Sequence, residues 1–343
     1  IDVCKYLLML YEIAPDNFFD GQLNIPENHN GIPDIVDEAA WSLGIFDRLR
    51  DKDGGVRYGV ESDGDPDMIT PPDLDYKRDF ALGKHPGRTL EYAGLAAQYS
   101  RILSKFNKEE KSKKYLSWAK ESYMWALKNG GENYPDQMCL ASILLYRATG
   151  DKFYLENFNK YSVFSKNPDA ELEIYRKYNQ VDASFYYLFC KKPVDKTIRR
   201  RILRAFQRRM NLWIKWAETT GYRYMKHPWA PNTWGTGAYP IWMIFPIQYY
   251  TIFGDKECLK WIILTCDFSL GCNPMNLVFT TKLGKRYIVG PLHLYSRYSP
   301  DHPIPGLQCE GPSPQIGGKK PKSSMSSWVA AGLYPYGPWP QLH

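Results

Sequence analysis

The stretch Gly31-Ile-Pro-Asp-Ile-Val-Asp-Glu-Ala-Ala-Trp41 precedes a short glycine-rich segment, Asp53-Gly-Gly-Val56. Pro33 suits the first position of a helix, because the N–H that proline lacks would have no partner there. Carboxylates follow in the first turn, where the helix dipole favours negative charge. Apolar residues then recur at steps of three and four, at Ile35, Ala39, Leu43, Phe46 and Leu49. The pattern predicts an amphipathic helix over about 32–51 that ends at a tight turn.

Helical patterns cover most of the remaining chain, and strand patterns are scarce. The further predicted helices lie at about 89–106, 109–129, 136–148, 152–164, 179–191, 196–218, 240–253 and 256–270. Two junctions share one pattern, since Tyr146-x-x-x-Gly150-Asp151 recurs as Tyr250-x-x-x-Gly254-Asp255. Glycine ends a helix and aspartate begins the next. The recurrence favours an array of paired helices, and the alternative is that two similar turns arose by chance.

The composition of the sequence changes after residue 273, where proline and glycine become frequent and apolar residues no longer recur at helical spacing. Long irregular loops on a regular scaffold often carry function. We therefore predict a single domain over residues 1–343, with a helical scaffold whose loops build the site.

The composition argues against several classes of protein. The chain has 343 residues, 24% of them charged, and a net charge of +7, as in ordinary globular proteins. Basic residues between Arg199 and Arg209 alternate with apolar ones at helical spacing, which favours a solvated basic helix face over a nucleic-acid surface. Seven cysteines without a C-x-x-C pair predict neither a zinc site nor a disulfide framework. The most apolar run, 239–253, is shorter than the ~20 residues of a membrane span, and we interpret it as a buried helix.

The opening stretch and its turn resemble the pattern of glycoside hydrolase family 9, G-I-P-D-(L/I)-(L/V)-D-E-x-x-W followed by D-G-G-V. Asp267-Phe-Ser-Leu-Gly-Cys-Asn-Pro274 resembles a later family motif, D-(Y/F)-x-L-G-x-N-P. The resemblance implies an all-α fold, an (α/α)6 barrel of six inner and six outer helices, whose D-G-G-V turn lines a sugar cleft. It implies hydrolysis, with inversion, of a β-1,4-linked glycan such as cellulose, mixed-linkage glucan or xyloglucan. We expect a secreted, periplasmic or cell-surface monomer with a β-glycan substrate and no nucleic-acid or membrane partner, although no signal peptide is visible.

Inverting hydrolysis requires two carboxyl groups ~6.5–9.5 Å apart, one to activate water and one to protonate the leaving oxygen. Asp2-x-x-Lys5-Tyr6 resembles the second half of the family motif D-x-G-D-x-x-K-(Y/F), so the resemblance assigns Asp2 as the general base. The alternative is that Asp2 is simply a terminal acid. The first aspartate of that motif has no counterpart, and neither has the acid of an Asn-Glu pair that follows G-P-W in the family. We expect this glutamate beyond His343.

Several loop residues are candidates for holding the sugar. Trp234-Gly-Thr resembles the family's W-G-S, whose indole packs on a sugar face, and Ala238 replaces an arginine that commonly follows. The segment 291–297 resembles P-H-H-R, whose histidine and arginine bond the sugar, although His293 and Arg297 could instead brace the loop. The candidate substrate-binding residues are Trp234, His293, Arg297, Tyr295, Tyr58 and Trp229. Asp136 is predicted to be a helix cap.

No cofactor and no metal ligand are predicted. Members of the family often hold structural calcium, but the acidic loop Asp63-Gly-Asp65-Pro-Asp67 is more typical of a solvated surface. Three other functions stay open: a carbohydrate-binding pseudoenzyme of the same fold, an exo-acting glucosaminidase-type member of the family, and a helical-toroid enzyme of different chemistry.

Overall fold

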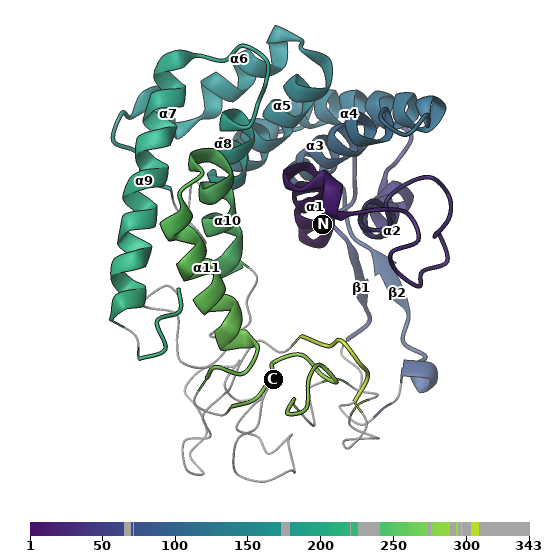
Figure 1. The fold of residues 1–343 in the computed structure, drawn as a ribbon. Helices are drawn as coiled ribbons and strands as arrows, with labels where there is room; N and C mark the ends of the chain where they lie inside the picture. The colour runs from purple at the N-terminus through teal and green to yellow at the C-terminus, as the bar shows by residue number, and fades with distance from the viewer. Residues whose placement is uncertain are drawn as a thin grey trace. The chain divides into compact units, whose positions relative to one another are not determined.

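The computed structural model is mostly helical (Figure 1). It describes residues 1–64, 70, 72–172, 179–219, 221–225, 241–273, 276–288, 293, 296 and 303–308. The chain divides into two compact units, the first made of residues 1–64 and 78–206 and the second of residues 65–77 and 207–343.

The first unit consists of consecutive helices that pack against one another as hairpins. Its helices are α1 (Asp2–Ile13), α2 (Asp34–Leu49), α3 (Pro86–Leu103), α4 (Glu109–Lys128), α5 (Pro135–Thr149), α6 (Lys152–Tyr161), α7 (Val163–Lys166), α8 (Val181–Leu188) and the first half of α9 (Lys196–Glu218), with the 3-10 turns η1 (Pro15–Asn17) and η3 (Gly131–Asn133). The inner helices are α1, α3, α5 and α8, and each contacts the next one in this order. The outer helices α2, α4 and α6 each pack on the inner helix that precedes them in the chain. This alternation is the inner and outer arrangement that the sequence predicted.

Among the described residues, strands form one antiparallel hairpin. It joins β1 (Val60–Ser62) to β2 (Asp79–Ala81), with Glu61 opposite Phe80. All of its residues are exposed, so it adds nothing to the core.

The inner helices approach one another closely because small residues stand at their contacts. A Cβ on Gly94 of α3 would lie 3.0 Å from the Cα of Ala141 on α5. Such a distance leaves no room for a larger side chain, so this glycine sets the spacing between the two helices.

The two predicted hairpin corners are confirmed. Gly150 and Gly254 adopt the left-handed conformation, with φ of +79° and +64°, that glycine takes readily. The aspartate after each glycine begins the next helix. Asp151 Oδ1 accepts a hydrogen bond from Phe153 N at 3.0 Å, and Asp255 Oδ1 accepts one from Glu257 N at 3.0 Å.

The second unit contains the second half of α9, α10 (Ile241–Phe253), α11 (Lys256–Ser269) and the turn η2 (Pro72–Leu74). A small core that includes Phe268 of α11 is built from Tyr224, Phe268, Phe279 and Ile288. The family-like Asn273 lies beside it, and its Nδ2 donates to the carbonyl oxygens of Phe268 at 2.7 Å and Leu277 at 2.8 Å. This asparagine therefore closes the turn after α11.

Helix α9 is the amphipathic helix that the sequence predicted. Ile202, Phe206, Met210 and Trp213 are buried, and Lys196, Arg200 and Arg204 are exposed. In the described part of the chain, no helix has both the length and the apolar character that crossing a membrane requires. The six cysteines described there are free.

Several helix expectations differ from the structure. The helices predicted over 89–106 and 179–191 span Pro86–Leu103 and Val181–Leu188. Helix α1 was not predicted, because its apolar run 7–10 lacks a helical period. The helix predicted over 152–164 is two helices, since Ser162 caps α7 by accepting from Phe164 N. Pro33 precedes α2 as its N-cap, and its carbonyl accepts hydrogen bonds from Val36 N at 2.8 Å and Asp37 N at 3.3 Å.

Carboxylates at the start of α2 hold the preceding loop. Asp34 is fully buried, and its carboxylate accepts hydrogen bonds from Gly21 N at 2.9 Å and from Leu23 N. Asp37, one turn later, accepts from Asn30 Nδ2 at 3.0 Å. The carboxylates of the first turn thus hold the preceding loop in place and also interact favourably with the helix dipole.

Asp37 makes stability depend on pH. Burial raises the pKa of Asp37 to about 6, with Glu27 and Asp20 adding to the effect and Asn30 opposing it. The folded protein therefore loses this contribution to stability as the pH rises from about 4 to 6 and Asp37 ionises. We expect Asp37→Asn to raise the free energy of unfolding by about 1–2 kcal/mol at pH 7 and to have no effect below about pH 4.

Urea denaturation across this pH range measures the difference between the wild type and the variant. The exposed Asp16 provides a matched Asp16→Asn control that should leave stability unchanged at each pH. A gain from Asp37→Asn of equal size at pH 4 and pH 7 would contradict this account.

Candidate active site

The N-terminal ends of the inner helices of the first unit bring polar side chains together. Lys5 of α1 pairs with Asp182 of α8, with Nζ and Oδ2 2.7 Å apart. The Tyr134 hydroxyl, at the start of α5, lies 3.1 Å from Nε2 of His85, at the start of α3. Helix N-termini carry positive partial charge and free N–H groups, so this end of the unit suits polar ligands.

Asp2 lies in the first turn of α1 with its side chain 74% exposed. Its carboxylate pairs with Lys5 Nζ at 3.0 Å. Partial burial raises the pKa of Asp2, but the charge and hydrogen bond of Lys5, together with the charge of Arg88, oppose burial, and the pKa lies below its usual value. An ionised carboxylate in contact with water meets the chemical requirement for a general base.

Three rings form a cluster at the start of α3. The ring of His85 lies 5.0 Å from that of Tyr58 and 4.8 Å from that of Tyr134, both at steep angles. His85 Nδ1 accepts from Arg88 N at 3.1 Å, so the neutral imidazole carries its proton on Nε2, facing the Tyr134 hydroxyl. The Arg88 guanidinium stands 5.1 Å from the centre of the Tyr58 ring. Arg88 thus lies close to Tyr58 and acts electrostatically on Asp2.

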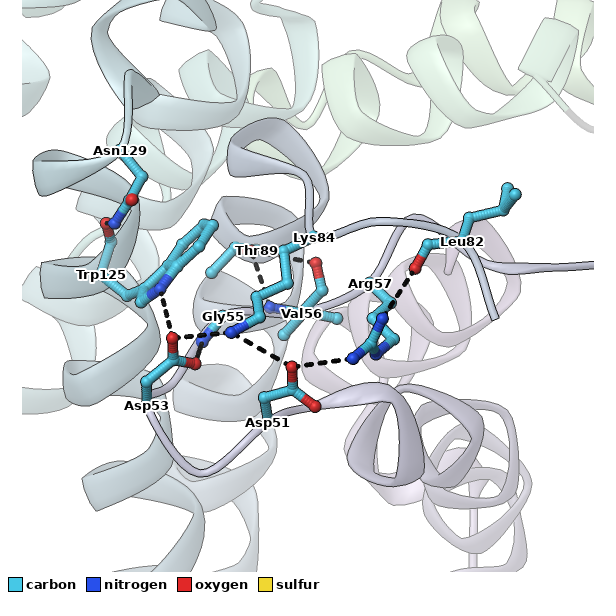
Figure 2. Close-up of polar contacts among 10 residues, drawn as sticks. All are labelled: Asp51, Asp53, Gly55, Val56, Arg57, Leu82, Lys84, Thr89, Trp125 and Asn129. Atoms are coloured by element: carbon cyan, nitrogen blue, oxygen red, sulfur yellow. Dashed lines mark hydrogen bonds and ion pairs between the residues drawn. The ribbon is translucent and has the colours of Figure 1, made fainter. Parts of the chain in front are cut away.

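The Asp53-Gly-Gly-Val56 turn is held by a polar network (Figure 2). Asp53 Oδ2 accepts from Lys84 Nζ at 2.7 Å and from Trp125 Nε1 at 3.0 Å, and the Lys84 bond keeps the pKa of Asp53 below its usual value. Lys84 Nζ also pairs with Asp51 at 3.1 Å. Val56 N donates to Thr89 Oγ1 of α3 at 2.9 Å. The turn is therefore fixed to α3 and α4, and the chain leads from it directly to Tyr58.

The turn requires glycine at position 55. A Cβ there would lie 2.6 Å from the Trp125 ring and 2.7 Å from the Lys84 side chain. We expect Gly55→Ala to lower the free energy of unfolding by about 1–3 kcal/mol, because the added methyl displaces Lys84 and Trp125, two of the partners of Asp53. Gly59→Ala is the matched control, since no atom lies within 4 Å of its added Cβ, and it should stay within about 0.5 kcal/mol in the same thermal or urea denaturation. Equal effects of the two substitutions would contradict the packing argument.

A model of glycosyl hydrolase family 9 matches residues 5–330. The chain belongs to this family. It is 24% identical to the xyloglucan-specific endo-beta-1,4-glucanase BoGH9A of Bacteroides ovatus, an alignment that covers 89% of this chain and 57% of that protein. It is also 24% identical to endoglucanase D of Acetivibrio thermocellus over 54% of this chain and 32% of that protein.

Solved structures of the family share the fold. A metagenome-derived family 9 endoglucanase superimposes with a TM-score of 0.78 at 23% identity, covering 91% of this chain and 59% of its own. A family 9 structure from Bacteroides ovatus gives a TM-score of 0.79 at 22% identity, covering 96% and 64%. The chain therefore spans less than two thirds of the length of these relatives, and the predicted fold class, the (α/α)6 barrel of this family, is confirmed.

The structure places only some of the predicted sugar-binding residues. Tyr58 is 49% exposed beside Arg88 in the first unit. His293 is half-buried, with Nδ1 3.3 Å from Ser296 Oγ. The remaining predicted residues lie outside the described residues: Trp229, Trp234, Tyr295 and Arg297.

Asp136 was wrongly predicted to cap a helix. It stands in the first turn of α5, where no side chain caps the helix, and its Oδ2 accepts from Asn179 N at 2.8 Å. Asp136 therefore fastens the segment before α8 to α5. Sequence reasoning also missed His85 and Asp182, and the signal that could have found them is their position at the start of predicted helices.

Within the described residues, no three His, Cys, Asp or Glu side chains are grouped as a metal site would require. Asp65 and Asp67 of the acidic loop lie outside the described residues.

Proposed function

We propose that the protein hydrolyses a β-1,4-linked glucan with inversion at the anomeric carbon, using Asp2 as the general base. The observation that carries this proposal is the exposed, ionised Asp2 at the N-terminal end of α1 in a chain that matches a glycosyl hydrolase family over nearly its whole length. The endoglucanase names of its relatives support a β-1,4-glucan substrate, and the xyloglucan-specific relative makes xyloglucan the first to test.

The roles follow from the chemistry of inversion. Asp2 takes a proton from a water molecule while that water attacks the anomeric carbon opposite the leaving group. Lys5 and Arg88 keep Asp2 ionised. Aromatic rings stack on the apolar faces of the sugars, and polar groups bond the hydroxyls. We assign stacking to Tyr58, Trp229 and Trp234, and hydrogen bonding to His293, Tyr295 and Arg297. We assign the role of general acid to the glutamate of the family's Asn-Glu pair.

We further propose that both units belong to one catalytic domain, because the family model runs through both. The enzyme works outside the cytoplasm as a monomer and needs no cofactor. Gel filtration and activity after dialysis against EDTA test the last two points. Loss of activity that calcium restores would overturn the last of them.

The decisive experiment offers the full-length protein xyloglucan, mixed-linkage glucan and carboxymethyl cellulose. We expect new reducing ends, and proton NMR of the first products should show the α-anomer. Products that begin as the β-anomer would contradict inversion. Binding without cleavage by folded protein would favour the pseudoenzyme, and release of single sugars from chitosan oligomers would favour the exo-acting glucosaminidase.

A further inference from the structure

Lys5 stands between two carboxylates from different helices. Its Nζ lies 3.0 Å from Asp2 Oδ1 and 2.7 Å from Asp182 Oδ2. We propose that Asp182 is a positioning residue, which holds Lys5 in place and through it sets the position and basicity of Asp2. This inference rests on the proposed function, since it takes Asp2 as the general base.

Burial separates the roles of the two carboxylates. The side chains of Lys5 and Asp182 are only 14% and 18% exposed, whereas that of Asp2 faces water. Asp182 is fixed in the first turn of α8, and a buried lysine paired with it has little freedom to move. Lys5 is therefore held in one position. Its ion pair with Asp2 positions that carboxylate, whose outer face stays open to water.

The charge balance keeps Asp2 basic. An ammonium group donates three hydrogen bonds and can serve both carboxylates at once. Because one positive charge is shared between two negative ones, Lys5 neutralises Asp2 only in part. A full, unshared pair would stabilise the ionised form of Asp2 further and make it a weaker base.

Further charged and titratable groups act on the pair. Arg88 supplies positive charge near Asp2, and the ring of Tyr6 lies 4.4 Å from Lys5 Nζ. Burial lowers the pKa of Lys5, but Asp182, Tyr6 and Asp2 outweigh burial and raise it well above its usual value, so Lys5 stays charged. Burial and Asp182 raise the pKa values of Tyr6 and Tyr186, which stay neutral.

Two substitutions should move the pH profile in opposite directions. In Asp182→Asn, Lys5 pairs with Asp2 alone, so the acidic limb of kcat/KM should move to lower pH and kcat should fall about ten- to a hundredfold as Asp2 loses its position and basicity. In Lys5→Met, Asp2 loses its positive partner, so the acidic limb should move to higher pH. A purely structural role for Asp182 would move neither limb.

Carbon-13 NMR titration of the Asp2 carboxyl in the same variants gives a readout that does not depend on turnover. Asp16→Asn and Lys113→Met, both at exposed positions, are the matched controls and should leave the titration unchanged. If Asp182→Asn fails to fold, Asp182→Glu keeps the charge but displaces it by one methylene, and kcat should fall several-fold with KM unchanged. An unchanged kcat in Asp182→Glu would overturn the inference.

The outcomes separate this inference from the proposed function. Wild-type hydrolysis by Asp2→Asn would refute the assignment of the base, and with it the inference. An inactive Asp2→Asn, combined with an unmoved acidic limb and an unmoved Asp2 titration in folded Asp182→Asn and Lys5→Met, would overturn the inference alone. Opposite shifts in the two variants would support it.

Discussion

Replacement of Asp2 by asparagine should lower kcat for glucan hydrolysis by about 10²- to 10⁴-fold, because an amide cannot take the proton of the attacking water. The side chain is mostly exposed, and Lys5 keeps its ion pair with Asp182 in the variant, so the free energy of unfolding should change by less than about 1 kcal/mol. Initial rates of reducing-sugar release and a urea denaturation curve measure the two quantities on one preparation.

The Asp16→Asn variant is the matched control for this experiment, since it removes an exposed carboxylate from the turn that follows α1. Its kcat should equal that of the wild type. Should Asp2→Asn retain more than a tenth of the wild-type kcat, Asp2 would not be the base, and an enzyme of different chemistry on the same scaffold would be favoured.

Replacement of Glu12 should have the largest effect on the free energy of unfolding. Its side chain is 2% exposed near the C-terminal end of α1, and it pairs with Arg101 of α3 and, at 2.9 Å, with Arg147 of α5. Burial and the nearby Arg147 lower the pKa of Arg101 to about 10, because a buried positive charge beside a second one is disfavoured. Glu12→Gln leaves both guanidinium groups without this carboxylate, so we expect a loss of about 3–5 kcal/mol in the free energy of unfolding.

Glu121→Gln provides the comparison. Glu121 also pairs with an arginine, Arg50, but its side chain is 48% exposed, and its removal should cost less than about 1 kcal/mol. Urea denaturation at pH 7 measures both variants. A loss below 1 kcal/mol for Glu12→Gln would mean that water or other groups already compensate the two arginines.

The helices predicted from the sequence have nearly the observed bounds where a long apolar period extends over the whole helix. The helix predicted at 196–218 has those bounds, and the one predicted at 109–129 ends one residue earlier. Both alternate apolar and charged residues over more than five turns, a signal that local sequence carries by itself. Helix α1 was missed because an unbroken apolar run fits several structures equally well.

The site was harder to predict than the fold. Motif resemblance led to Asp2 and to the Asp53–Val56 turn, whose glycine at 55 the packing explains. It could not lead to Asp182, whose contact with Lys5 joins residues from opposite parts of the first unit's sequence. Periodicity reports which face of a helix is apolar, but it carries no information about which helix ends meet.

The same long-range contacts bear on how the chain reaches its native state. Hairpin corners such as Gly150-Asp151 join neighbouring segments, so the entropy lost in closing them is small. The Glu12–Arg147 pair joins residues 135 positions apart and has to wait until the intervening hairpins have assembled. We therefore expect hairpins to fold first and this ion pair to form late, so that Glu12→Gln speeds unfolding in stopped-flow measurements and leaves the refolding rate almost unchanged.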